Sequence, residues 1–153
     1  MAGPLATRRT VLTAIGGAGL ALAVRPAQAT PETMKSAIRQ VVGEAAVKPG
    51  RINPDLPPLI ENGNTVAMAV TVDSPMTAND HVKAIHVFTE KNPQPNVISA
   101  KLGPRAGKAD IQIRVRLADT QTVVAICEMS DGAFWSNTVD VIVTLGACLE
   151  DPV

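Results

Sequence analysis

The spacing of apolar residues along the chain indicates one helix followed by a series of strands. In residues 31–46 apolar side chains recur three or four positions apart, which is the period of an amphipathic helix. Thr30 and Pro31 favour the start of this helix, because threonine caps helix N-termini and proline suits the first helical position. Residues 52–60 contain three prolines. Since proline cannot donate to a strand ladder, we expect an extended edge segment or a linker there.

After residue 60 apolar positions alternate with polar ones, as they do in strands that bury one face. The alternation predicts strands at residues 65–73, 81–90, 97–102, 110–118, 121–129 and 134–145. Residues 121–129 are apolar on both faces, which favours a central position in a sheet. The last strand is expected to turn Leu145 inward. Several short strands after a single helix predict a mainly β protein, an immunoglobulin-like antiparallel β-sandwich preceded by one N-terminal α-helix.

The segment Glu61–Asn64 predicts a tight turn between the extended segment 52–60 and the strand at residues 65–73. It contains Asn62-Gly63, a pair that tolerates the positive φ angles of a two-residue hairpin loop. We therefore expect a β-hairpin at this point of the chain.

The first 29 residues have the features of an export signal. Arg8 and Arg9 form a twin-arginine pair ahead of the apolar run 14–24, and Ala27-Gln28-Ala29 resembles a cleavage site. The apolar run is shorter than the roughly 20 residues that span a membrane. A cleaved signal and a periplasmic product are therefore expected, and an uncleaved anchor is the alternative.

This interpretation divides the chain into four parts. Residues 1–29 are the signal peptide, 30–60 the helix and a proline-rich linker, 61–145 the sandwich domain, and 146–153 a C-terminal cysteine arm. Signal removal takes away Arg8, Arg9 and Arg25, which leaves 11 basic residues against 14 acidic ones. A net charge near −3 argues against nucleic acid or an anionic membrane as a partner.

The chain has two cysteines, Cys127 and Cys148, in different surroundings. Cys127 lies in an apolar strand, where a cysteine usually behaves as a small core residue. Cys148 follows the last predicted strand, near the end of the sequence. Two cysteines in an oxidising compartment often form one disulfide, so a Cys127–Cys148 bridge and a separate role for Cys148 are both open.

Other candidate groups have ordinary structural interpretations beside functional ones. His81 and His86 are five residues apart on one predicted strand, so they point to opposite faces and cannot share a metal ion. Arg114 and Arg116 alternate outward, as on a solvated sheet face or at an anion site. Phe134-Trp135 fits either core packing or a partner contact. No motif for a cofactor or for catalysis is present in the sequence.

Several segments together resemble the SoxY family, the sulfur-carrier subunits of bacterial thiosulfate oxidation. The segments are Glu61–Val66, Val72–Met76, Val82–Phe88, Lys91–Pro95, Glu128–Gly132 and the terminal Cys148. The resemblance implies a heterodimer with a SoxZ-like second sandwich subunit. It also implies that a haem-containing enzyme conjugates thiosulfate to Cys148, after which a sulfate-releasing hydrolase and a sulfur dehydrogenase act on the adduct. The carrier itself holds no cofactor and catalyses nothing.

The arm around Cys148 differs from the family pattern, which places two glycines on each side of the cysteine. Here Gly146 matches a glycine, whereas Ala147, Leu149 and Glu150 replace others. The resulting arm is bulkier, and its acidic residues are expected to lower the fraction of thiolate. Two hypotheses follow. The protein is a periplasmic sulfur carrier, or a scaffold subunit whose Cys148 is idle or bridged to Cys127.

Overall fold

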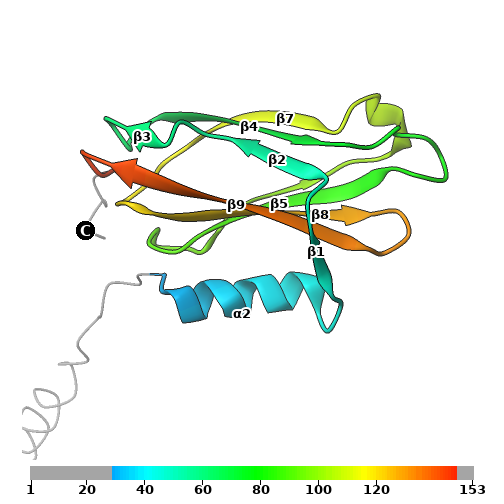
Figure 1. Ribbon diagram of the computed structural model, residues 1–153, viewed down its shortest axis with the longest axis horizontal. Helices are drawn as coiled ribbons and strands as arrows, with labels where there is room; N and C mark the ends of the chain where they lie inside the picture. Colours follow the sequence, from blue (N-terminus) through cyan, green and yellow to red (C-terminus); the bar gives the residue numbers. More distant parts are fainter. Residues whose placement is uncertain (1–28, 148–153) are drawn as a thin grey trace, which may run out of the picture.

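The computed structural model describes residues 29–147, which fold into two facing β-sheets with one helix on the outer side (Figure 1). The larger sheet has the strand order β1-β9-β8-β5-β6, with β3 also paired to β9, and the smaller sheet has the order β2-β4-β7. The elements are α2 (Pro31–Val42), β1 (Val47–Pro49), β2 (Ile52–Asp55), β3 (Leu59–Ile60), β4 (Val66–Val72), β5 (Val82–Thr89), β6 (Asn96–Lys101), the 3₁₀ turn η1 (Pro104–Ala106), β7 (Asp110–Val115), β8 (Gln121–Met129) and β9 (Phe134–Val143). The mainly β sandwich with a preceding helix is confirmed.

The predicted central strand is β8, which lies between β9 and β5. Its inner side chains, including Val123 and Cys127, are buried between the sheets, and Ile126 on the other side is buried in a second apolar cluster. Both faces of β8 are therefore shielded from water, which is why its sequence does not alternate. In the smaller sheet β4 alternates as predicted, with Val66, Met68, Val70 and Val72 buried.

Helix α2 begins where the sequence predicts and ends earlier. Thr30 caps the helix by accepting a hydrogen bond from the Thr33 backbone amide at 3.3 Å. The helix ends at Val42, because Gly43 takes up a φ of 61° at the C-cap, so the expected extension to residue 46 is wrong. Met34 packs with Phe88 and Phe134. The apolar side of the helix thus covers the outer face of the larger sheet. The part of the chain that the structure describes contains no helix that could cross a membrane.

Residues 47–60 form edge strands of both sheets rather than a separate linker. β2 is an edge strand of the smaller sheet, while β1 and β3 pair with β9. Both of these pairings are parallel, whereas the other strand pairs among residues 29–147 are antiparallel, as predicted. Parallel pairing is possible here because each of these segments is separated from β9 by most of the domain, which supplies the crossover that parallel strands need.

The predicted hairpin at Asn62-Gly63 is also wrong. β3 before the turn pairs with β9, and β4 after it pairs with β2 and β7, so the two strands belong to different sheets. Leu145 is another correction: it lies beyond the end of β9 and is 59 % exposed, whereas it was expected to point inward.

The bulky pair at the start of β9 has two different environments. Phe134 is buried against α2, as core packing predicts. Trp135 is half-buried, with the Lys48 ammonium 5.4 Å and the Arg51 guanidinium carbon 5.6 Å from its ring centroid. These are cation–π distances, so the Trp135 ring is already occupied by basic side chains of its own chain.

Candidate functional site

The candidate site is the point at which the C-terminal arm leaves the sandwich. Of the predicted arm residues, the structure describes Gly146 and Ala147, whereas Cys148 and Leu149 lie outside the described residues. Residues 1–28 of the predicted signal peptide also lie outside them, and only its last residue, Ala29, is described. The geometry of the site is therefore that of the support on which the cysteine is carried.

Ala147 is held against the body of the domain. Its backbone amide donates a hydrogen bond of 2.9 Å to the carbonyl of Leu117, and the residue is 8 % exposed. Gly146 lies equally close to the chain: a Cβ atom added to it would come within 2.1 Å of the Ala118 carbonyl oxygen. At this glycine the lack of a side chain allows a close approach between two backbones. The residues just before Cys148 are thus fixed in place.

Gly63 joins three segments at the same place. Its amide donates to the Leu145 carbonyl at 2.7 Å, and its carbonyl accepts from the Leu117 amide at 2.8 Å. A Cβ atom on Gly63 would lie 2.2 Å from the Leu117 carbonyl oxygen and 3.0 Å from the Ala147 nitrogen. Gly63 therefore serves close packing rather than a hairpin turn. We call Gly63, Leu117, Ala118, Gly146 and Ala147 the arm base.

A buried asparagine, Asn92, forms hydrogen bonds to the segment of the chain that contains Leu117 and Ala118 of the arm base. The Asn92 side chain is 9 % exposed and donates through Nδ2 to the Arg116 carbonyl at 2.8 Å. Its Oδ1 accepts hydrogen bonds of 3.1 Å each from the Ala118 amide and from Nε2 of Gln121. One side chain thus fixes both ends of the segment on which Gly146 and Ala147 rest.

Sequence reasoning did not identify Gly63, Asn92 or Leu117 as parts of the site. A signal was nevertheless present, because Gly63 and Asn92 belong to two of the segments that carry the family resemblance, Glu61–Val66 and Lys91–Pro95. The structure brings these two segments together at the arm base. At its rim, the Lys91 ammonium bonds to the Asp119 carboxylate at 2.9 Å and lowers the pKa of that carboxyl group.

Cys127 lies in a different part of the molecule. Its side chain is fully buried between the sheets, and this burial raises the pKa of the thiol to about 11. It pairs with Trp135 across the ladder, whereas Ala147 lies near the Gln121 end of β8. Six residues of strand from Gln121 to Cys127 span about 20 Å. A disulfide needs Cα atoms within about 7 Å, so a bridge from the residue after Ala147 would require the arm base to open.

The two histidines are placed separately. His81 Nδ1 lies 3.1 Å from the Thr77 carbonyl oxygen, and His86 Nδ1 lies 2.8 Å from Ser99 Oγ. Burial lowers the pKa of His86. Within residues 29–147 no group of three His, Cys, Asp or Glu side chains could hold a metal ion.

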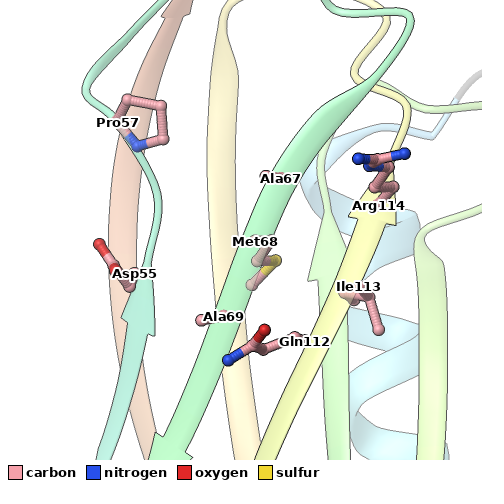
Figure 2. Close-up of a pocket in the computed structure, with 8 residues that line it drawn as sticks. All are labelled: Asp55, Pro57, Ala67, Met68, Ala69, Gln112, Ile113 and Arg114. Carbon is pink, nitrogen blue, oxygen red and sulfur yellow. The ribbon is translucent and has the colours of Figure 1, made fainter.

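A hollow of ≈ 430 Å³ lies on the outer face of the smaller sheet (Figure 2). Ala67 and Ala69 of β4 form its floor, Asp55 of β2 lies on one side, and Gln112 and Arg114 of β7 lie on the other. Its walls are thus small apolar side chains and a few solvated polar ones, with no pair of groups in hydrogen-bond contact that could carry out acid–base chemistry.

Comparison with known families and structures agrees with the fold and with the motifs. The model of the family described as sulfur oxidation protein SoxY matches residues 38–148. The structure of the sulfur carrier protein SoxY from Chlorobium limicola f. thiosulfatophilum is 26 % identical, covers 74 % of this chain and 98 % of its own, and superposes with a TM-score of 0.63. No curated protein matches the sequence.

Superoxide reductases share the fold at lower identity. The neelaredoxin from Ignicoccus hospitalis is 16 % identical over 75 % of this chain and 94 % of its own, with a TM-score of 0.54. The superoxide reductase from Nanoarchaeum equitans is 11 % identical over 63 % of this chain and 100 % of its own, also with a TM-score of 0.54. At these identities the likeness concerns the sandwich alone.

Proposed function

Because the chain belongs to the SoxY family of sulfur oxidation proteins, we propose that it is a periplasmic sulfur carrier that holds sulfur intermediates covalently on Cys148. The observation that carries the proposal is the arm base, where Ala147 is fixed at one end of the sandwich directly before the cysteine. The other thiol of the chain, Cys127, is buried about 20 Å away along β8 and has a raised pKa.

The chemistry of loading follows from the two reacting groups. The Cys148 thiol and thiosulfate combine to give a Cys–S–S–SO₃⁻ adduct, releasing one proton and two electrons to the haem-containing loading enzyme. Hydrolysis by the sulfate-releasing enzyme adds water, releases sulfate and two protons, and leaves Cys–S–S⁻. A sulfur dehydrogenase then oxidises the remaining sulfur. The carrier contributes the attachment atom and its position, and no catalytic group of its own.

A heterodimer with a SoxZ-like sandwich subunit is part of the proposal. The mature chain is slightly acidic, which accords with protein partners rather than with nucleic acid or a membrane surface. The helix α2 and the larger sheet already cover one another, so we place this partner on other faces of the sandwich.

Intact mass measurement after incubation with thiosulfate and the loading enzyme tests the proposal. We expect one thiosulfate adduct on the exported protein, the same adduct on Cys127→Ala, and none on Cys148→Ser. A protein that stays unmodified while a glycine-armed homologue is loaded would support the scaffold alternative instead. Non-reducing peptide mapping distinguishes the two further, since an intramolecular Cys127–Cys148 bridge contradicts the carrier role.

Thiol alkylation provides a check that needs no partner enzyme. In Cys148→Ser, iodoacetamide should label the folded protein slowly up to about pH 9, because burial raises the pKa of Cys127 from 9.0 to about 11. Labelling should become fast in urea, where the thiol is exposed. Fast labelling of this variant in the folded state would mean that Cys127 is a second accessible thiol.

A further inference from the structure

The large apolar side chains that residues 29–147 leave exposed lie together at one end of the sandwich. They are Leu59, Ile142 and Leu145, which are 56 %, 57 % and 59 % exposed. Leu59 and Ile142 are direct partners in the parallel ladder between β3 and β9. Leu145 lies two residues beyond the end of β9, and its carbonyl accepts the 2.7 Å hydrogen bond from Gly63 of the arm base. We call these three side chains the apolar patch.

A hollow of ≈ 380 Å³ adjoins the apolar patch at Leu59. More than half of the residues that line it are apolar, namely Pro57, Leu59, Ile60, Val66 and Ala67. In the described part of the chain β3 pairs with β9 alone, so no strand of residues 29–147 covers its other edge. Exposed apolar side chains beside a hollow and an open strand edge are typical of a surface that binds another protein.

Two carboxylates border the apolar patch. Asp140 is exposed two residues before Ile142, on the same side of β9, and Glu61 is exposed directly after β3. Neither carboxylate forms an ion pair with any of residues 29–147. A protein surface that complements this region therefore has apolar side chains at its centre and lysine or arginine around them.

The place and the size of the apolar patch indicate which partner binds there. The Thr144 amide donates to the Ile60 carbonyl at 2.9 Å, and Thr144 Oγ1 donates to the Glu61 carbonyl at 3.0 Å, so β3 is bonded to the segment that leads into Ala147. An enzyme that acts on the residue after Ala147 has to approach this end of the sandwich. A permanent subunit interface needs about 20 to 30 residues on each side, so a patch of three apolar side chains suits a transient partner.

We propose that the apolar patch is the docking surface for the haem-containing loading enzyme, which contacts it through apolar side chains ringed by basic ones. The proposal rests on the proposed function for the identity of this partner. It means that the loading enzyme recognises the folded sandwich as well as the cysteine. The carboxylates of Asp140 and Glu61 attract the basic ring, and burial of Leu59 and Ile142 holds the complex together.

Binding of the loading enzyme to a Cys148→Ser carrier tests the docking surface without turnover. Adding Leu59→Thr and Ile142→Thr should raise the dissociation constant at least about tenfold, because threonine removes apolar surface from the contact. Both positions are exposed, so the fold should be kept. Asp140→Asn should have a smaller effect and make binding less sensitive to salt. Thr138→Ala, at an exposed position on the same strand, is the control and should leave the dissociation constant unchanged.

Amide ¹⁵N spectra of the carrier, in complex with its SoxZ-like subunit, locate the contact. Unlabelled loading enzyme should broaden the signals of Leu59, Ile142 and Leu145 and leave that of Thr138 sharp. The proposal is wrong if the enzyme does not bind, if it broadens signals elsewhere, or if the SoxZ-like subunit or a second copy already covers the apolar patch. Because docking is measured on Cys148→Ser, an enzyme that binds the patch but fails to load the unaltered carrier would contradict the proposed function alone.

Discussion

The two ends of the sandwich are held together in different ways. At the arm base, backbone groups of Gly63, Leu117 and Ala147 bond to one another or to Leu145, and two glycines leave no space for a Cβ atom. At the opposite end, the backbone also joins the loops, since the Ser130 amide donates to the His81 carbonyl at 2.8 Å, but exposed side chains add further connections. Ser130 Oγ donates to the Asn79 carbonyl at 3.0 Å, and Arg51 meets Asp80 at 3.8 Å with both groups partly exposed.

The difference indicates that the arm base is the end that holds a segment of the chain in a fixed position. Backbone contacts without intervening side chains leave little freedom for adjustment, because each atom is already at van der Waals distance. Exposed ion pairs and hydroxyl bonds tolerate movement and contribute little to stability. A rigid base is what an arm needs if its cysteine is to start from a constant place. The following predictions test this contrast in order of expected size.

Gly63→Ala should have the largest effect on stability. The new Cβ atom would lie 2.2 Å from the Leu117 carbonyl oxygen, which belongs to the backbone and cannot rotate away. We expect a loss of about 3 kcal/mol in the free energy of unfolding, measured by urea denaturation. Gly103→Ala is the control, because nothing lies within 4 Å of its Cβ position. Equal midpoints for the two variants would show that the arm base is looser than its contacts indicate.

Asn92→Ala should have the second-largest effect, a loss of about 2 kcal/mol in the free energy of unfolding. The substitution removes the partners of the Arg116 carbonyl, the Ala118 amide and the Gln121 side chain. Asn137→Ala serves as the control, because that exposed amide makes only a local bond to Thr138. If both amide variants unfold at the same urea concentration, the Asn92 network adds nothing to the stability of this end.

Gly146→Ala should lower the free energy of unfolding by a smaller amount, about 1 kcal/mol. The reason is that the last described residues can separate from Ala118 while the sandwich stays folded. Its local effect should be clear: the Ala147 amide loses its bond to Leu117 and exchanges with solvent faster. Native-state hydrogen exchange measures this directly. Unchanged protection of Ala147 would contradict the close approach at Gly146.

Asp80→Asn should change stability least, by about 0.5 kcal/mol or less. Its carboxylate meets Arg51 at 3.8 Å, and the two side chains are 49 % and 30 % exposed. The backbone carbonyl of residue 80, which accepts from Thr77, is kept in the variant. A loss comparable to that of Asn92→Ala would remove the distinction between the two ends.

The strands that bury one or both faces were predictable, because burial imposes its own period on the sequence. β4 and β8 are found where the pattern placed them, and β8 is central because its sequence is apolar on both sides. The start of α2 was predictable from Thr30 and Pro31, whose effects are local.

The errors concern residues whose role depends on distant neighbours. Gly63 has the local chemistry of a hairpin turn, but its partners are Leu117 and Leu145, more than 50 residues away in sequence. For the site, the sequence indicated the cysteine and its arm, but the support formed by Asn92 and residues 116–121 exists only in the folded chain.

The parallel pairing of β9 has a consequence for the order in which the chain folds. Val47 pairs with Phe134 and Leu59 with Ile142, so these early segments have no ladder partner until nearly the whole domain has been synthesised. Contacts between such distant parts of a chain make folding slow. β1, β3 and the arm base are therefore completed last, together. A nascent chain cannot position its cysteine before the sandwich has closed.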